Sequence, residues 1–229
     1  MPRQPRLIVA GYPHHIILRG NNRSAIFDND KDRRFFLKCL EEAKKKTSSK
    51  IYAYCLMTNH VHLLIEPRTN NAISDMLQSL GRRYVRYINA AYKRTGTLWE
   101  GRFKSSLVSQ DEYFLACIRY IELNPIRAKI AKELKDYPWS SFKFRAEGKS
   151  NSLLSEDPVY SALGKTPKER QEKYKEWLKK NISDEELNLI RNVTQRGGIF
   201  SSKDFFDKIA KITGRDVALK PRGRPRKSL

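Results

Sequence analysis

The sequence predicts an α+β fold, a split βαββαβ sandwich in which helices cover one antiparallel sheet. The first observation is that short β-prone runs alternate with longer segments of helical periodicity over the first 145 residues or so. The second is that only Thr58 and Asn59 separate two of the β-prone runs. Two residues can close a hairpin but cannot make the crossover of a parallel pair, so a doubly wound parallel sheet fits less well.

The first half of this domain supplies three strands and one helix. Residues 14–18 form a β-prone run that ends at a Gly-Asn-Asn turn signal. A helix is expected over about 31–47, because apolar side chains recur at helical spacing behind an Asp-Asn-Asp cap. Residues 51–56 make the second strand, and the third begins near His60 and ends at a proline.

The second half supplies two longer helices with a strand between them. One apolar stripe predicts a helix over about 71–94, and a strand is expected over 98–108. Residues 109–112 have the pattern of a capping box and open a helix that contains Tyr120. Asn124 precedes a proline, a cap-then-first-position signal, so a short helix is expected to restart there.

The composition changes near residue 147, where a linker-like run of Gly, Ser, Asn and Lys begins. We therefore divide the chain into a main α+β domain, a helical region and a basic tail, over 1–146, 147–215 and 216–229. Helices are expected in the second region over about 167–180, 184–195 and 202–213. The last two fit either a helix-turn-helix reader of DNA or a small helical packing module, and we favour the second interpretation.

The basic tail contains the run KPRGRPRK, in which Arg222 and Arg224 flank a glycine. An extended Arg-Gly-Arg-Pro core can place its arginines in a narrow A·T-rich minor groove, where the potential is most negative. The tail resembles an AT-hook; the alternative is a solvated basic tail without a specific contact.

The charge of the chain indicates a polyanionic partner. Its 229 residues carry 46 Lys and Arg against 25 Asp and Glu, a formal net charge of +21. This excess argues against a neutral enzyme of small metabolites and favours a nucleic-acid partner. Three cysteines stand singly in apolar surroundings, and neither a transmembrane run nor a signal peptide is recognisable. We expect a cytoplasmic, nucleoid-associated protein without a membrane partner.

The pair His60 and His62 is the first candidate for a chemical site. Alternate residues of a strand face the same side, so the two imidazoles lie next to each other. Two neutral imidazoles can provide two ligands of a divalent metal and leave positions open for substrate. Alternatively, both are ordinary half-buried strand residues, and the His-x-His motif alone does not decide between the two.

Tyr120 and Asn124 offer the groups that the histidine pair lacks. They are four residues apart and share one face in helical geometry. The amide oxygen of Asn124 can be a third metal ligand, and the phenol of Tyr120 can attack phosphorus beside the metal. The competing interpretation makes Tyr120 a core residue and Asn124 a helix cap, and spacing alone leaves both open.

Three ordered motifs resemble those of the REP-associated tyrosine transposases, relatives of the single-tyrosine HUH transposases of small insertion sequences. They are YCLMTNHVHLL over 54–64, GTLWEGRFKS over 96–105 and RYIELNPIRA over 119–128. The resemblance covers roughly residues 7–145. It implies a ferredoxin-like catalytic domain with His60 and His62 as metal ligands, although valine stands between them here. It also implies Tyr120 as nucleophile and Asn124 as the third ligand.

The resemblance further implies Mg²⁺ or Mn²⁺ as cofactor and hairpin-forming single-stranded DNA as substrate. The targets of the family are repetitive extragenic palindromes, and its cleavage leaves a 5′-phosphotyrosine link and a free 3′-OH. Basic side chains are expected to bind this DNA through its phosphates; the candidates are Arg82, Arg83, Arg102, Arg222 and Arg224.

The sequence thus predicts a metal-dependent DNA-nicking and joining enzyme, a transposase, which acts as a monomer or a homodimer. The alternative is a non-catalytic protein that binds hairpin or A·T-rich DNA and retains only a vestigial site. A third possibility is a nuclease that uses water as nucleophile and therefore forms no covalent intermediate.

Overall fold

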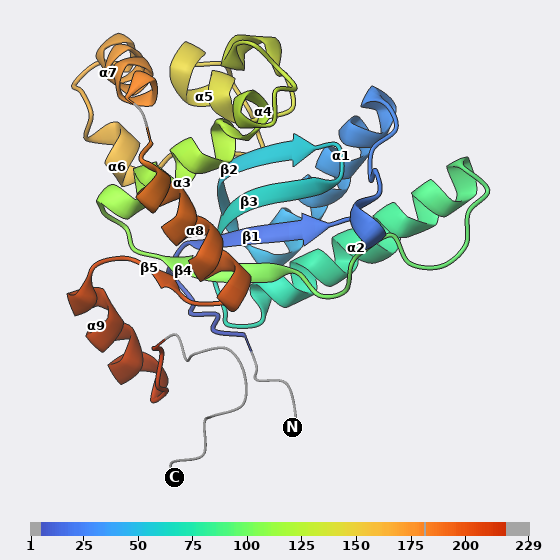
Figure 1. Cartoon of the computed structure of the whole chain (residues 1–229), viewed down its shortest axis with the longest axis horizontal. Coiled ribbons are helices and arrows are strands. Elements are labelled where there is room, and N and C mark those ends of the chain that lie inside the picture. The colour runs from blue at the N-terminus through green and yellow to red at the C-terminus, as the bar shows by residue number, and fades with distance from the viewer. Residues whose placement is uncertain (1–5, 181, 219–229) are drawn as a thin grey trace.

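A single mixed sheet organises the computed structural model, which describes residues 6–180 and 182–218 (Figure 1). Its strand order is β2-β3-β1-β4-β5. The first four strands pair antiparallel, whereas β5 pairs parallel with β4. The strands are β1 (His14–Arg19), β2 (Lys50–Met57), β3 (His60–Glu66), β4 (Lys104–Val108) and β5 (Ile199–Phe200).

Two amphipathic helices cover one face of this sheet, behind it in Figure 1. They are α1 (Asp30–Thr47) and α2 (Ala72–Ala91), which pack on each other and on a core that includes Phe36 and Tyr84. Helix α1 begins at a capping box, in which the Asn29 side chain accepts from the third helical amide and that residue's carboxylate accepts in return. The order β1-α1-β2-β3-α2-β4, with β3 between β1 and β2, confirms the predicted split βαββαβ sandwich.

The other face of the sheet lies beneath helices α3 (Glu112–Glu122) and α8 (Asp184–Arg196). Helix α3 packs on β2 and β3, and the short helix α4 (Asn124–Arg127) follows it directly. Helix α8 crosses β4 and reaches β1. This face therefore receives one helix from the main domain and one from the C-terminal region.

The C-terminal region is helical as predicted, but it also extends the sheet. Its remaining helices are α6 (Pro158–Ser161), α7 (Pro167–Lys179) and α9 (Lys203–Thr213), and α5 (Phe142–Glu147) precedes them; 3₁₀ turns occur at Asn21–Arg23 and Leu134–Asp136. Strand β5 separates α8 from α9, so these two helices are not joined as a helix-turn-helix. None of the described helices combines the length and the apolar character needed to cross a bilayer.

Three predicted details are wrong. The strand expected over 98–108 is confined to β4, because Gly96 and Gly101 adopt φ values of 82° and 93° and turn the preceding chain away. Helix α2 ends at Ala91 rather than near residue 94. The cap of α3 is Asp111, whose carboxylate accepts from the Tyr113 amide, rather than a capping box over 109–112.

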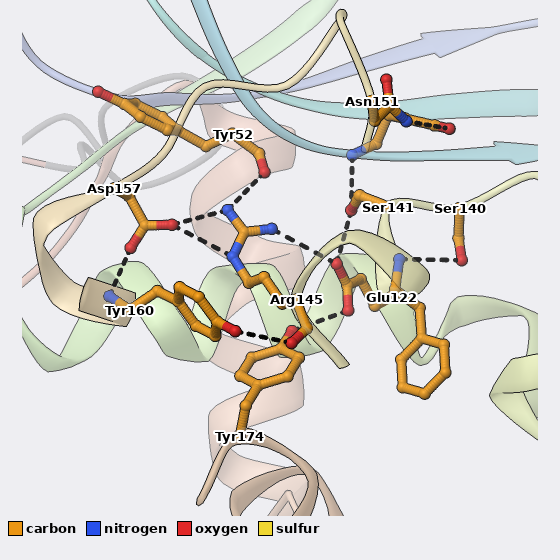
Figure 2. A network of polar contacts seen from close by, with 11 residues as sticks. Tyr52, Glu122, Ser140, Ser141, Arg145, Asn151, Asp157, Tyr160 and Tyr174 are labelled. Carbon is orange, nitrogen blue, oxygen red and sulfur yellow. Dashed lines mark hydrogen bonds and ion pairs between the residues drawn. The ribbon is translucent and has the colours of Figure 1, made fainter. Parts of the chain in front are cut away.

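A fully buried arginine joins four elements beside α3 (Figure 2). Arg145 of α5 donates to Asp157 Oδ2 through Nε at 3.1 Å and Nη2 at 2.7 Å. Its Nη2 also donates to the Tyr52 carbonyl of β2 at 2.7 Å, and its Nη1 lies 3.7 Å from Glu122 Oε1. Because charges are rarely buried without partners, these contacts define where the four elements meet.

Glu122 is the end of this network that belongs to α3. Its carboxylate accepts from Ser141 Oγ at 2.6 Å and from the Tyr174 hydroxyl at 2.8 Å. Burial raises the pKa of Glu122, and the nearby arginine and the two hydroxyl donors oppose that rise. The network thereby fixes the C-terminal end of α3, two residues after Tyr120.

Candidate active site

The two histidines of β3 face α3 and α8 as their alternation predicts. Their ring centroids are 4.9 Å apart, and both side chains line a cavity of about 300 Å³. The structure brings all four predicted site residues to this cavity, because Tyr120 and Asn124 also line it. Tyr120 belongs to α3, which packs on β2 and β3, and Asn124 begins α4 directly after it.

Tyr120 differs from the structural tyrosines of the molecule. It is only 4% exposed, and its ring centroid lies 5.7 Å from that of His62. The hydroxyls of Tyr84 and Tyr137 donate to buried backbone carbonyls at 2.6 Å, as expected of core tyrosines. Tyr120 instead faces the cavity in which the histidines lie.

Asn124 is held by the end of α3 through its amide nitrogen. Nδ2 donates to the Tyr120 carbonyl at 2.8 Å and to the Ile121 carbonyl at 3.1 Å. Because carbonyls only accept, the nitrogen must be the atom that faces them, and Oδ1 is left for the cavity. Asn124 does not cap α4 through its side-chain oxygen, because the N-cap of that helix is Leu123. The amide nitrogen of Asn124 therefore holds the end of α3, and the role of Oδ1 as a metal ligand stays a prediction.

The histidines are neutral at pH 7. Burial, aided by Arg19, lowers the pKa of His60 to about 4, and burial lowers the pKa of His62 well below its ordinary value. His60 Nδ1 contacts Asn59 Oδ1 at 2.6 Å, while Asn59 Nδ2 donates to the Arg23 carbonyl. An amide oxygen only accepts, so Nδ1 of His60 carries the proton and Nε2 keeps a lone pair.

A further histidine, His15, is buried next to the pair and was missed from the sequence. His15 Nε2 contacts His62 Nδ1 at 2.8 Å, and His15 Nδ1 contacts Thr194 Oγ1 of α8 at 3.0 Å. Burial lowers the pKa of His15 to about 3. Strand alternation could have placed His15 on the site face, but no sequence signal connects Thr194 to this site.

Cationic side chains surround the cavity. The Arg127 guanidinium lies 4.5 Å from the centroid of the Tyr120 ring, and Arg102, Lys104 and Arg191 also line the space. Arg127 was not predicted, although its position seven residues after Tyr120 puts it two helical turns further on the same face. Such a lining attracts an anionic substrate such as a phosphodiester.

The predicted DNA-binding arginines divide into three groups. Arg82 and Arg102 line a second hollow of about 770 Å³, and Arg102 also lines the first cavity. Arg83 pairs with Glu42 of α1 and lines neither space. Arg222 and Arg224 lie outside the described residues.

Comparison with known proteins identifies the family. The sequence matches the family described as "Transposase IS200 like" over residues 9–124, just over half of the chain. The chain belongs to the IS200-like transposases. The matched region of this IS200-like transposase includes both site histidines and Tyr120 and ends at Asn124. Helix α8 lies outside it.

One relative and one solved structure extend the comparison. A protein of Haemophilus influenzae named as a REP-associated tyrosine transposase is 26% identical over 100 residues, which are 39% of this chain and 57% of that protein. The chain thus spans little more than half of that relative. A REP-associated tyrosine transposase solved with a REP hairpin is 18% identical, with a TM-score of 0.55 over 69% of this chain and 93% of that one. This likeness supports the fold of the IS200-like transposase.

A second solved structure is more distant. It is a crystal structure from Deinococcus radiodurans described as a transposase, 18% identical over 59% of this chain and 98% of that one, with a TM-score of 0.37.

Proposed function

We propose that this IS200-like transposase is a metal-dependent endonuclease and strand transferase for single-stranded DNA. Its targets would be hairpin-forming repetitive extragenic palindromes, and its intermediate a 5′-phosphotyrosine on Tyr120. The observation that carries the proposal is that Tyr120 lines one cationic cavity together with His60, His62 and Asn124. A tyrosine used only for packing would donate its hydroxyl to a buried acceptor, as other core tyrosines of this chain do.

The side chains around the cavity fit Mg²⁺ or Mn²⁺. They offer neutral imidazole nitrogens and the amide oxygen of Asn124, donors that suit divalent ions of hard to intermediate character. Within residues 6–180 and 182–218 no three His, Cys, Asp or Glu side chains gather into a metal cluster, so the amide is the natural third donor. When bound, the ion would polarise a phosphodiester oxygen.

The protein side chains account for the transfer itself. The Tyr120 oxygen attacks phosphorus and forms the new O–P bond, while the bond from phosphorus to the 3′ oxygen breaks and a 3′-OH is released. The tyrosine gives up its proton, and the departing oxygen gains one. Arg127, above the Tyr120 ring, stabilises the negative charge that develops on the phosphoryl group and the phenol oxygen. Rejoining reverses the same bond exchange.

The hollow next to the cavity provides a path for the DNA strand. Gly101 and Arg102 line both spaces, so the two are adjacent. The hollow is mainly apolar, with Trp99 and Phe103 in its wall, and Arg82 and Arg102 among its four lining arginines. Aromatic and arginine planes stack on unpaired bases, while phosphates meet the cations. The solved neighbour that was bound to a REP hairpin supports a DNA hairpin as the substrate.

The decisive experiment incubates the full chain with labelled hairpin oligonucleotides that carry randomised single-stranded flanks, in the presence of Mn²⁺, followed by a denaturing gel. We expect a covalent protein–DNA band with the wild type and none with Tyr120→Phe, although that variant still binds the DNA. Tyr113→Phe is the matched control, because Tyr113 lies on the same helix and packs on Phe200 away from the cavity.

Each other outcome has a definite meaning. An unchanged adduct yield with Tyr120→Phe would overturn the assignment of the nucleophile. Cleavage by the wild type without any adduct would indicate a nuclease that uses water. Salt-sensitive binding without cleavage in any divalent metal would indicate a non-catalytic DNA-binding protein.

A further inference from the structure

We propose that Thr194 of α8, acting through His15, fixes the tautomer of His62 so that the Nε2 lone pair faces the cavity. Thr194 is thus a positioning residue that lies beyond the family match. The consequence for metal binding rests on the proposed function, whereas the tautomer itself does not.

The argument begins with the single proton of the Thr194 hydroxyl. Oγ1 lies 2.8 Å from the Ile190 carbonyl one turn earlier in α8. A carbonyl cannot donate, so the threonine proton must occupy this bond. Towards its other two neighbours, Ser106 Oγ and His15 Nδ1, both at 3.0 Å, the threonine oxygen can then only accept.

The next two steps pass along the histidines. Because Thr194 only accepts, His15 must carry its proton on Nδ1, and its Nε2 is then an acceptor. His15 is almost fully buried, and its recorded hydrogen bonds go to a hydroxyl and to an imidazole rather than to a carboxylate, so a second proton on its ring would be an unpaired buried charge. His62 therefore donates from Nδ1 at 2.8 Å, and its remaining nitrogen, Nε2, keeps its lone pair.

The two site histidines thus reach the same tautomer by different routes. Asn59, the adjacent residue, accepts from Nδ1 of His60. For His62 the acceptor is His15, and its own orientation depends on a threonine 179 residues further along the chain. Partners of this kind set the ring orientation and basicity of metal ligands, and their loss typically weakens metal binding by about 10- to 100-fold.

The test uses the full chain with ¹⁵N-labelled histidine, without metal and without DNA, because imidazole ¹⁵N shifts report which nitrogen is protonated. We expect His62 in the wild type to carry its proton on Nδ1. Thr194→Val removes the acceptor of His15 at nearly constant volume, and we expect a mixture of His62 tautomers. Thr194→Ser keeps the hydroxyl and should restore the wild-type spectrum.

Ser106→Ala is the matched control. Ser106 contacts the same threonine oxygen but is not part of the relay, the hydrogen-bonded series Thr194–His15–His62. The His62 signals should therefore not change. In parallel, we expect the Mn²⁺ affinity measured by EPR to fall about tenfold or more in Thr194→Val. In Thr194→Ser and in Ser106→Ala it should stay near the wild-type value.

The proposal is overturned by a wild-type His62 protonated on Nε2, a result that does not depend on whether any variant folds. It is also overturned by an unchanged His62 tautomer in folded Thr194→Val. If the predicted tautomers are found but no DNA adduct ever forms, the relay stands and the proposed function fails. If the wild type forms the adduct but Thr194→Val keeps the wild-type tautomer, the proposed function stands and the relay fails.

Discussion

Helix α3 carries two buried polar clusters whose key residues are only two positions apart and whose designs are opposite. Around Glu122 an arginine and two hydroxyl groups converge on the carboxylate, and the cluster is packed closed (Figure 2). Around Tyr120 the side chains of His60, His62 and Asn124 line an open cavity. The comparison teaches that burial of polar groups alone does not mark an active site.

The two clusters differ in whether all of their polar side chains are bonded within the protein or some of them line a cavity. In the closed cluster the carboxylates and the arginine neutralise each other, so the cluster holds the surrounding helices and strand β2 in fixed positions. In the open cluster one nitrogen of each imidazole and the amide nitrogen of Asn124 bond to other protein groups, and all three side chains line the cavity. The following predictions separate the clusters by their effect on the free energy of unfolding, from the largest to the smallest.

Removal of the arginine of the closed cluster should be the most damaging change. Arg145→Ala leaves Glu122 and Asp157 buried without their counter-charge, and we expect the free energy of unfolding to fall by about 3–5 kcal/mol. Urea titration followed by circular dichroism measures it. Lys173→Ala is the control, because this exposed lysine pairs with Glu169 on the surface and should cost less than about 0.5 kcal/mol. Equal losses in both variants would contradict a structural role for the buried cluster.

Acid should destabilise the protein through His14 of β1, a buried histidine outside both clusters that contacts Val9 and Tyr12. Burial lowers the pKa of His14 to about 3, against 6.5 in the unfolded chain, so between these values the unfolded chain binds more protons. The contribution of His14 to the free energy of unfolding is fully present above about pH 6.5 and is lost as the pH falls below that value. We expect about 2 kcal/mol less at pH 5 than at pH 7 from His14 alone.

The measurement is urea unfolding at both pH values for the wild type and for His14→Gln. The variant should have the shallower pH profile, because it lacks the titrating group. A wild-type free energy that does not change between pH 7 and pH 5 would contradict a buried neutral histidine here.

His60→Ala should separate function from stability. The imidazole is only half-buried and lines the cavity, so we expect the free energy of unfolding to change by less than about 1 kcal/mol. Metal-dependent adduct formation should nevertheless disappear, because one of the donors is lost. Adduct formation at the wild-type rate would remove His60 from the metal site, whereas a large loss of stability would place it with the structural cluster.

Arg102→Ala should leave the free energy of unfolding unchanged and affect only DNA. The side chain is exposed and lines both the cavity and the neighbouring hollow. Loss of one phosphate contact should reduce the slope of log K against log salt by about 0.7 for single-stranded DNA. Arg34→Ala, an exposed arginine of α1 behind the sheet, should keep the wild-type slope. Equal slopes for both variants would exclude Arg102 from the DNA path.

The sequence predicted the features that depend on short spacing. Strand alternation placed His60 and His62 on one face, and helical spacing placed Tyr120 near Asn124. These are local relations between residues at most four positions apart, and the backbone geometry of one element fixes them. The hairpin between β2 and β3 was predictable for the same reason, because a two-residue connection leaves little choice.

Contacts between distant segments were not predictable. The joining of Arg145 to the Tyr52 carbonyl and the addition of β5 to the sheet depend on how the C-terminal region folds back. No periodicity within either segment encodes such pairing. The first half of the strand expected over 98–108 is not formed, because Gly101 turns the chain and Trp99 and Phe103 line a hollow beside the sheet.

The distance along the chain between His15 and Thr194 also orders events in time. Protein synthesis proceeds from the N-terminus at about 5–20 residues per second, so β3 leaves the ribosome roughly 6 to 26 seconds before α8 does. During that interval the nascent protein holds the histidines without the helix that completes their surroundings. We expect ribosome-bound chains halted before α8 to form no adduct with hairpin DNA, and released full chains to form it. The proposed activity would then appear only when α8 has docked on the sheet.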